Sequence, residues 1–167
     1  MAPAPEIVWP FPEGQNRIRR GLEAHTFGMV RTKIVDGKRV PKAHQGWDFA
    51  APVGTPFRAI GSGTVEAVEE RGAFGLCLLL KHDRPHAGTP IWSFYAHLQS
   101  VVVEKGDHVT AGAPLGLTGD SGNAKGLPEA DEHLHLEMRL EAWPGLGTPG
   151  RFSPLAYFGR IPLTEAI

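Results

Sequence analysis

The chain has 167 residues, which is enough for one domain with a hydrophobic core and little else. Its formal net charge is −1, so no strong positive field is available to hold a nucleic acid, and we expect no nucleic-acid partner. No stretch is long and apolar enough to span a membrane. The N-terminus lacks a basic segment followed by an apolar one, so we expect no signal peptide in this chain.

The secondary-structure signals are those of a β protein. Residues 1–16 are Pro-rich and are expected to form an arm, followed by a helical turn at residues 17–22. From residue 47 onwards, short β-prone runs alternate with turns that contain Gly or Pro. These runs predict strands at residues 47–51, 56–60, 63–69, 76–82, 91–98, 100–103 and 133–140. Strong helix patterns are missing, so the prediction is a mostly β, single domain of antiparallel sheets with short helices only.

The single cysteine, Cys77, lies in the apolar run at residues 76–80. An apolar setting raises the pKa of a thiol, so we interpret Cys77 as a buried core residue and not as a nucleophile. One cysteine also cannot build the cysteine-rich ligand set that is typical of structural zinc sites.

One late segment alternates polar and apolar side chains. Successive side chains of a strand point to opposite faces, so His133, His135 and Glu137 are expected to share one face. Leu134 and Leu136 would then point into the core. Taken alone, two histidines at this spacing are a weak signal, because most such pairs are ordinary surface or core residues.

An earlier segment adds a histidine and a carboxylate, His44 and Asp48. Gly46 and the residues that follow predict a turn into a strand, which would let the two side chains converge. Asp48 could instead cap that turn through its own backbone. With the late histidines, the set of two imidazoles and one carboxylate suits a catalytic zinc site, since it leaves a coordination position open for water.

The motifs resemble those of the lysostaphin-type, or LytM-type, zinc metallopeptidases, which are peptidoglycan endopeptidases. That family has His-x-x-x-Asp early, His-x-His late and a further histidine between them, here within the Tyr-Ala-His-Leu run at residues 95–98. Flanking segments also match, and the resemblance covers roughly residues 9 to 158. The matching flanks are residues 46–56, 59–65, 106–112 and 153–155.

The resemblance implies one Zn²⁺ per chain, with His44, Asp48 and His135 as ligands. It assigns the catalytic roles to His97 and His133.

The resemblance also implies a duplicated hybrid motif as the fold. We expect the chain to divide into an N-terminal arm or entry loop (residues 1–16), a metallopeptidase catalytic domain (residues 17–158) and a C-terminal tail (residues 159–167). The implied substrate is the peptide part of peptidoglycan, met in the periplasm or outside the cell. The bond that is cut, the export route and any delivery or immunity partner stay open.

Two further residues are expected to lie next to the site. Tyr95 precedes His97 by two residues and is expected on the same strand face, where substrate contact and packing are equally good interpretations. Glu137 is expected to hold an imidazole nitrogen of His135 in the correct tautomer. The remaining histidines match no motif position and are expected to be solvated or structural; they are His25, His82, His86 and His108.

The sequence departs from the family at two places that border the expected cleft. Residues 27–31 contain one residue more than the usual Phe-Gly-x-Arg, and the loop before His133 is extended through residues 124–132. Both changes bear on substrate preference. Residues 83–90 and 119–132 have the length of functional loops and directly precede segments with site histidines, so we expect both to wall the substrate groove.

Three other functions were weighed. A non-catalytic wall-binding or activating module of the same fold would usually lack metal ligands, whereas all five positions are filled here. A biotinyl or lipoyl carrier would need a lysine at a hairpin tip, which residues 103–112 do not offer. Residues 116–122 are Gly-rich, but no P-loop lysine and no βαβ pattern accompany them.

Overall fold

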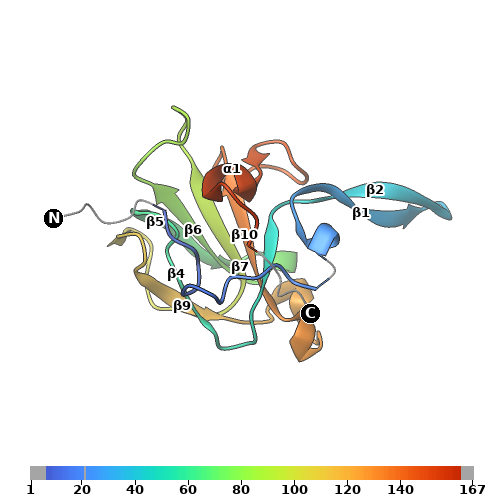
Figure 1. Cartoon of the computed structure of the whole chain (residues 1–167), viewed down its shortest axis with the longest axis horizontal. Helices are drawn as coiled ribbons and strands as arrows, with labels where there is room; N and C mark the ends of the chain where they lie inside the picture. Colours follow the sequence, from blue (N-terminus) through green and yellow to red (C-terminus); the bar gives the residue numbers. More distant parts are fainter. Residues whose placement is uncertain (1–6, 21, 163–167) are drawn as a thin grey trace.

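The computed structural model describes residues 7–20 and 22–162 (Figure 1). Strands dominate it. They are β1 (Gly28–Val35), β2 (Lys38–His44), β3 (Trp47–Ala50), β4 (Pro56–Arg58), β5 (Gly63–Glu70), β6 (Leu76–His82), β7 (Trp92–Val101), β8 (His108–Val109), β9 (Pro114–Thr118), β10 (His133–Arg139) and β11 (Arg151–Phe152). The helical segments are short: α1 (Pro154–Phe158) and four 3₁₀ turns at Leu22–His25, Gly72–Phe74, Gly122–Ala124 and Glu129–Asp131.

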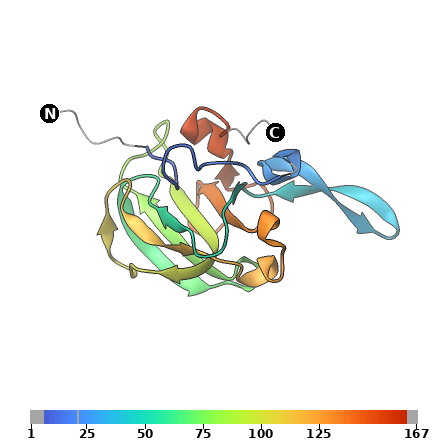
Figure 2. The ribbon, with the colours of Figure 1, turned by 60° about the horizontal axis from the view of Figure 1, so that its bottom comes forward.

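All strand pairs are antiparallel, which confirms the predicted mostly β architecture with short helices. The main sheet has the order β11-β10-β7-β6-β5-β8, with β3 beside β10 and with β9 between β4 and β7. Strands β1 and β2 form a separate two-stranded ribbon that projects from the body in both views (Figures 1 and 2).

Strand β10 lies at the centre of the domain because it has partners on both edges. Residues 133–136 pair with β3, and residues 135–139 pair with β7. Leu134 and Leu136 are fully buried in the main hydrophobic cluster, as the alternation predicted. Burying each leucine stabilises the fold by about 1.5–3 kcal/mol, and it turns the polar face of β10 towards the cleft described below.

The N-terminal segment packs against the body. Phe11 is buried, and the ring of Trp9 stacks on Phe158 with 4.2 Å between centroids. Trp9 and Phe11 are therefore part of the packed structure, whereas residues 12–15 are exposed. The division at residue 17 and at residue 159 remains a prediction, and residues 163–167 lie outside the described part of the chain.

The helical turn predicted at residues 17–22 is wrong. Ile18 forms a β-bridge with Phe49, and a backbone hydrogen bond joins Arg19 N to Asp48 O. Pairing with β3 satisfies backbone groups that a helical turn would have left for water. A 3₁₀ turn forms instead at Leu22–His25.

Several strands were missed by the sequence analysis. Strands β1 and β2 belong to the exposed ribbon and carry few apolar residues at alternating positions. Strands β8 and β11 have two residues each, which is too short for a periodic pattern.

Cys77 is buried, and its thiol donates to the backbone carbonyl of Glu69 (3.2 Å). Burial raises the pKa of this thiol to about 11, in agreement with the predicted core position. Within residues 7–20 and 22–162, no helix has the length and apolar character needed to cross a membrane.

Candidate metal centre

The predicted ligands His44, Asp48 and His135 come together where β2, β3 and β10 meet. His44 ends β2, and the main chains of Asp48 and His135 are direct partners in the β3–β10 ladder. The turn between β2 and β3 passes so close to β10 that a Cβ at Gly46 would overlap the carbonyl of Leu136. Glycine is therefore required there for close approach.

One carboxylate oxygen stands between the two ligand histidines. Asp48 Oδ1 lies 3.2 Å from His44 Nε2 and 2.9 Å from His135 Nδ1. The candidate donor atoms of these three buried residues lie within 4.8 Å of one another. Such a distance allows all three to bind one ion.

The second nitrogen of each ligand histidine is already engaged. His44 Nδ1 donates to the carbonyl of Thr26 (2.8 Å), and His135 Nε2 donates to Glu137 Oε2 (2.9 Å). These bonds select the tautomers whose lone pairs, on His44 Nε2 and His135 Nδ1, face Asp48 Oδ1. Lone pairs facing a carboxylate repel it unless a metal cation, or a proton on one of the rings, lies between them. The donor set therefore fits a divalent metal ion, and its N and O atoms suit zinc.

The protonation of the ligands is set by their surroundings. Burial lowers the pKa of His44, which leaves it ready to bind a metal. Burial would also lower the pKa of His135, but hydrogen bonds to Asp48 and Glu137 outweigh it and raise that pKa to about 9. In the metal-free protein a proton therefore resides on His135 at neutral pH, and a metal must displace it.

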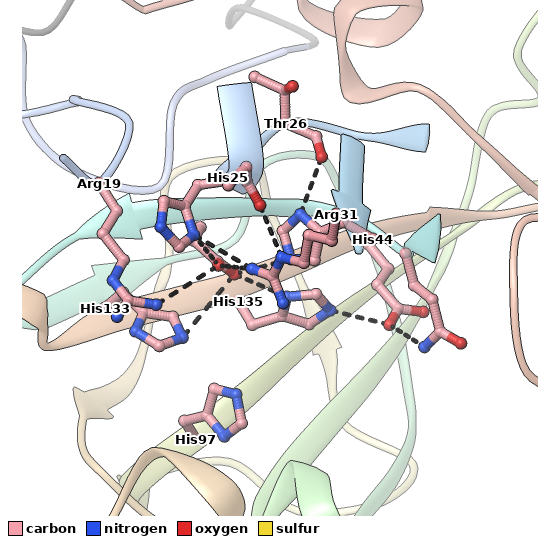
Figure 3. Close-up of polar contacts among 12 residues, drawn as sticks. Arg19, His25, Thr26, Arg31, His44, His97, His133 and His135 are labelled. Carbon is pink, nitrogen blue, oxygen red and sulfur yellow. Dashed lines mark hydrogen bonds and ion pairs between the residues drawn. The ribbon is translucent and has the colours of Figure 1, made fainter. Parts of the chain in front are cut away.

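The other carboxylate oxygen of Asp48 is held from the N-terminal side of the domain. Asp48 Oδ2 accepts hydrogen bonds from Arg31 (2.8 Å) and His25 (2.8 Å), while Arg19 lies at 3.9 Å (Figure 3). Burial by itself would raise the pKa of Asp48, but its close contacts with His135, His25 and His44 outweigh it and hold that pKa well below its usual range. Asp48 is therefore ionised, which suits it to bind a metal ion.

Sequence reasoning missed this support. His25 was expected to be solvated or structural without a place in the site. Arg31 was noticed only as the end of a motif that is one residue too long. The register of β1 against β2 shifts between Gly28 and Arg31, so the additional residue forms a β-bulge and Arg31 still reaches Asp48.

His97 reaches the cleft because β7 is irregular there. His97 has a positive φ of 61°, and the register of β7 against β6 shifts by one residue between Tyr95 and Leu98. The expectation that Tyr95 and His97 share a face is therefore wrong, because a bulge interrupts the alternation of side chains. Tyr95 is fully buried, and its hydroxyl accepts a hydrogen bond from Ile60 N (3.1 Å). The structure thus supports the packing interpretation of Tyr95.

His97 and His133 lie beside the ligands with ring centroids 5.1 Å apart. Each donates from Nδ1 to a backbone carbonyl: His97 to Ser121 (2.8 Å) and His133 to Asp131 (2.9 Å). These bonds leave Nε2 of both rings as a proton acceptor. His133 Nε2 lies 3.8 Å from Asp48 Oδ1.

Both of these imidazoles are neutral at pH 7. Burial, with a smaller effect from the neighbouring His135 and His133, lowers the pKa of His97 to about 4. Burial likewise lowers the pKa of His133. A neutral imidazole with a free Nε2 is the form that a general base requires.

Glu137 holds the ring of His135 through its Nε2 atom. Its carboxylate is fully buried, and Oε1 accepts hydrogen bonds from Arg139 (2.9 Å) and Arg151 (2.6 Å) while Oε2 contacts His135. Burial would raise the pKa of Glu137, but the hydrogen bond and charge of His135 and the two arginines lower it to about 2. The ring of His135 is thereby fixed in orientation.

The ligands and the two other histidines line a hollow of about 370 Å³, which we call the metal cleft. The loop at residues 119–132 forms one wall through Ala124 and Leu127 and supplies both carbonyls that orient His97 and His133. The predicted wall at residues 119–132 is thus in place.

The loop at residues 83–90 does not reach the metal cleft, and that prediction is wrong. It lines a different hollow, which we call the far hollow, together with His82 and Tyr157. Strand residues rise about 3.3 Å each, so the stretch from residue 91 to His97 separates the loop from the metal ligands by about 20 Å.

Comparison with known proteins places the chain in a family. The pattern of Peptidase family M23 matches residues 42–145, a stretch that contains all three ligands as well as His97 and His133. The chain belongs to this family. His25 and Arg31, which hold Asp48, lie before the matched residues.

Curated relatives of this M23 chain are much longer proteins. The peptidoglycan DD-endopeptidase ShyA of Vibrio cholerae is 33% identical over 101 residues, which are 60% of this chain and 21% of ShyA. The DD-carboxypeptidase/endopeptidase Mpg of Neisseria meningitidis is 31% identical over 103 residues, 62% of this chain and 21% of Mpg. The chain thus spans 21% of the length of both relatives.

Solved structures share the fold. A zinc containing peptidase from Vibrio cholerae superimposes with a TM-score of 0.64 at 27% identity, covering 92% of this chain and 40% of that one. LytU gives a TM-score of 0.64 at 26% identity, covering 93% of this chain and 92% of LytU. The latter match spans nearly the whole of both chains.

Proposed function

We propose that this M23 domain is a zinc-dependent endopeptidase that hydrolyses peptide bonds of bacterial peptidoglycan. The observation that carries the proposal is the convergence of His44 Nε2, Asp48 Oδ1 and His135 Nδ1 beside two neutral histidines. The name of ShyA, a peptidoglycan DD-endopeptidase, supports peptidoglycan as the substrate.

The three ligands leave coordination positions open towards the metal cleft. A zinc ion bound by His44, Asp48 and His135 would act as a Lewis acid that polarises a peptide carbonyl and a water molecule. Glu137 and the carbonyl of Thr26 keep the two ligand imidazoles in the tautomers that bind metal.

His97 and His133 carry the protons. Their Nε2 atoms accept a proton from the attacking water, and the imidazolium that results can donate to the oxyanion or to the leaving amine. Because Nδ1 of each ring stays bonded to the carbonyl of Ser121 or Asp131, neither ring must reorient between the two steps. Tyr95 has no part in this scheme, since its hydroxyl is enclosed in the core.

The substrate also determines where the protein works. Peptidoglycan lies outside the cytoplasmic membrane, so we propose action in the periplasm or outside the cell.

A digest of purified cell walls tests the proposal. Metal-replete protein is expected to contain about one zinc per chain by elemental analysis. It should release new amino termini from sacculi with direct cross-links, from sacculi with polyglycine bridges, or from both, and mass spectrometry of the fragments identifies the bond. Zinc-loaded protein that cuts neither wall type would instead be a non-catalytic member of the family.

A further inference from the structure

The β1–β2 ribbon is attached to the body at one end only. Figures 1 and 2 show it projecting away from the main sheet, and it forms a two-stranded sheet of its own. Most of its side chains beyond the base are exposed. An isolated two-stranded ribbon buries little apolar surface, so its side chains contribute little to the core of the domain.

The pairing register divides the ribbon into two faces. Residues that are directly opposite in an antiparallel pair share a face, and so do residues two apart on one strand. The register is regular from Arg31↔Lys42 to Val35↔Lys38. One face therefore combines two valines with four cations, of which Arg31 is already paired with Asp48; we call it the basic face, and it consists of Arg31, Lys33, Val35, Lys38, Val40 and Lys42.

The opposite face has a different character. Thr32 pairs with Pro41 and Ile34 pairs with Arg39, and the Arg39 guanidinium donates to the Thr32 hydroxyl (2.8 Å). It carries one cation, which is already bonded within the ribbon. The positive charge of the ribbon is therefore concentrated on one side.

The basic face is continuous with the metal cleft. Arg31 and Lys42, at the base of the ribbon, line the cleft beside the ligands. Lys33 and Lys38 extend the charge outward along the same face, at about 7 Å for every two residues of a strand. Among the ion pairs of the described residues, none involves Lys33, Lys38 or Lys42.

We propose that the basic face binds carboxylates of uncleaved peptidoglycan peptides next to the peptide in the metal cleft. A polymer that leaves the cleft on the side of Arg31 and Lys42 brings its neighbouring peptides to Lys33 and Lys38. Peptide carboxylates complement this charge. The net charge of −1 means that the attraction is not a property of the whole chain.

The inference rests on the proposed function, because it assumes that the polymer in the cleft is peptidoglycan. It adds a distinct property: affinity for the polymer should exceed affinity for a short peptide that only fills the cleft. Exposed ion pairs are individually weak, so the higher affinity for the polymer comes from several of them along the basic face.

The test compares substitutions on the two faces. Lys38→Gln and Arg39→Gln remove the same charge from adjacent positions, but only Lys38 lies on the basic face. The doubly substituted Lys33→Gln, Lys38→Gln protein gives the larger effect. Binding to sacculi is measured by sedimentation of metal-free protein across a range of salt concentrations. Zinc-loaded protein is assayed on a soluble cross-linked peptide that is too short to reach the ribbon.

The double variant is expected to bind sacculi about threefold to thirtyfold more weakly than the unsubstituted protein and with a smaller salt dependence. Lys38→Gln should show part of this loss, and Arg39→Gln should stay within about twofold. Hydrolysis of the short peptide should be unchanged in all three. Equal losses for Lys38→Gln and Arg39→Gln, or no loss in the double variant, would overturn the proposal.

Chemically modified cell walls identify which anion binds to the basic face. Amidation of sacculus carboxylates should reduce binding of the unsubstituted protein to the level of the double variant. Removal of phosphate-containing wall polymers should leave the difference between the two proteins intact. If instead only that removal abolishes the difference, a phosphate polymer occupies the face and the proposal is wrong. Failure to cut the short peptide would reject the proposed function, which is a separate result.

Discussion

The domain has two hollows lined by histidines, and only one of them has the features of a metal centre. The far hollow, about 740 Å³, is larger than the metal cleft, about 370 Å³. It contains His82 and His86, and its wall includes Asp83. Size and histidine content therefore do not distinguish the two regions.

The difference lies in the carboxylate and in how the imidazoles are committed. Asp48 is buried, with a side chain 1% exposed, whereas Asp83 is 43% exposed and pairs with His108 on the surface. His82 Nε2 is hydrogen-bonded to the hydroxyl of Ser93 (2.8 Å), so this nitrogen is already engaged inside the core. In the metal cleft the engaged nitrogens point outward and the free ones converge. A buried carboxylate surrounded by free imidazole nitrogens defines the site.

The largest expected effect separates the two hollows directly. Asp48→Ala should lose zinc and reduce peptide hydrolysis to background, because two imidazoles alone cannot hold the ion in this geometry. His44→Ala and His135→Ala should behave alike. His82→Gln, the control in the far hollow, should retain zinc and activity. Elemental analysis and hydrolysis are measured on the same preparations, and zinc retained by Asp48→Ala would contradict the ligand assignment.

The next effect distinguishes ligands from proton carriers within the metal cleft. His97→Ala and His133→Ala should keep near-normal zinc and lose about 10²- to 10⁴-fold in hydrolysis rate, which is the usual contribution of a positioned acid or base. His86→Ala in the far hollow should change neither quantity. If His133→Ala loses zinc while His135→Ala keeps it, the assignment within this pair is reversed.

Substitution of His82 in the far hollow should change the stability of the protein and not its catalysis. Burial lowers the pKa of His82 from 6.5 to about 4. Between these values the unfolded chain binds a proton that the native state does not, so stability falls as the pH drops from about 6.5 to about 4. The total contribution of His82 to this loss of unfolding free energy is about 3 kcal/mol. Denaturant unfolding of metal-free His82→Gln should show a correspondingly weaker loss between pH 7 and pH 4. An unchanged pH dependence would mean that His82 does not stay neutral in the fold.

The smallest effect concerns the residues that hold Asp48 from outside the matched family region. His25→Ala removes a hydrogen bond to Asp48 Oδ2 and should weaken zinc binding by about 10- to 100-fold. His108→Ala removes an exposed histidine that pairs with Asp83 and should leave zinc affinity unchanged. Competition with a chelator of known affinity measures both. Equal affinity in the two variants would show that the contact from His25 has no influence on the metal.

Local patterns in the sequence were sufficient for the mostly β character of the domain and for the face of β10. The alternation from His133 to Glu137 placed two leucines in the core and three polar residues on the opposite face, because a strand has a period of two residues. The resemblance to the lysostaphin-type peptidases then grouped His44 and Asp48 with these histidines. The structure brings the three expected ligands together within one small volume.

Only the tertiary structure decided the details that give each side chain its role. The bulge that brings His97 into the cleft and leaves Tyr95 in the core depends on the register of β7 against β6. The tautomers of the histidines depend on carbonyl and carboxylate partners as much as 24 residues away, as between His97 and Ser121. The support of Asp48 by His25 and Arg31, the charged face of the ribbon and the distant position of residues 83–90 follow from strand pairing as well. Side-chain period is encoded locally, whereas register, bulges and hydrogen-bond partners arise only when distant segments pair.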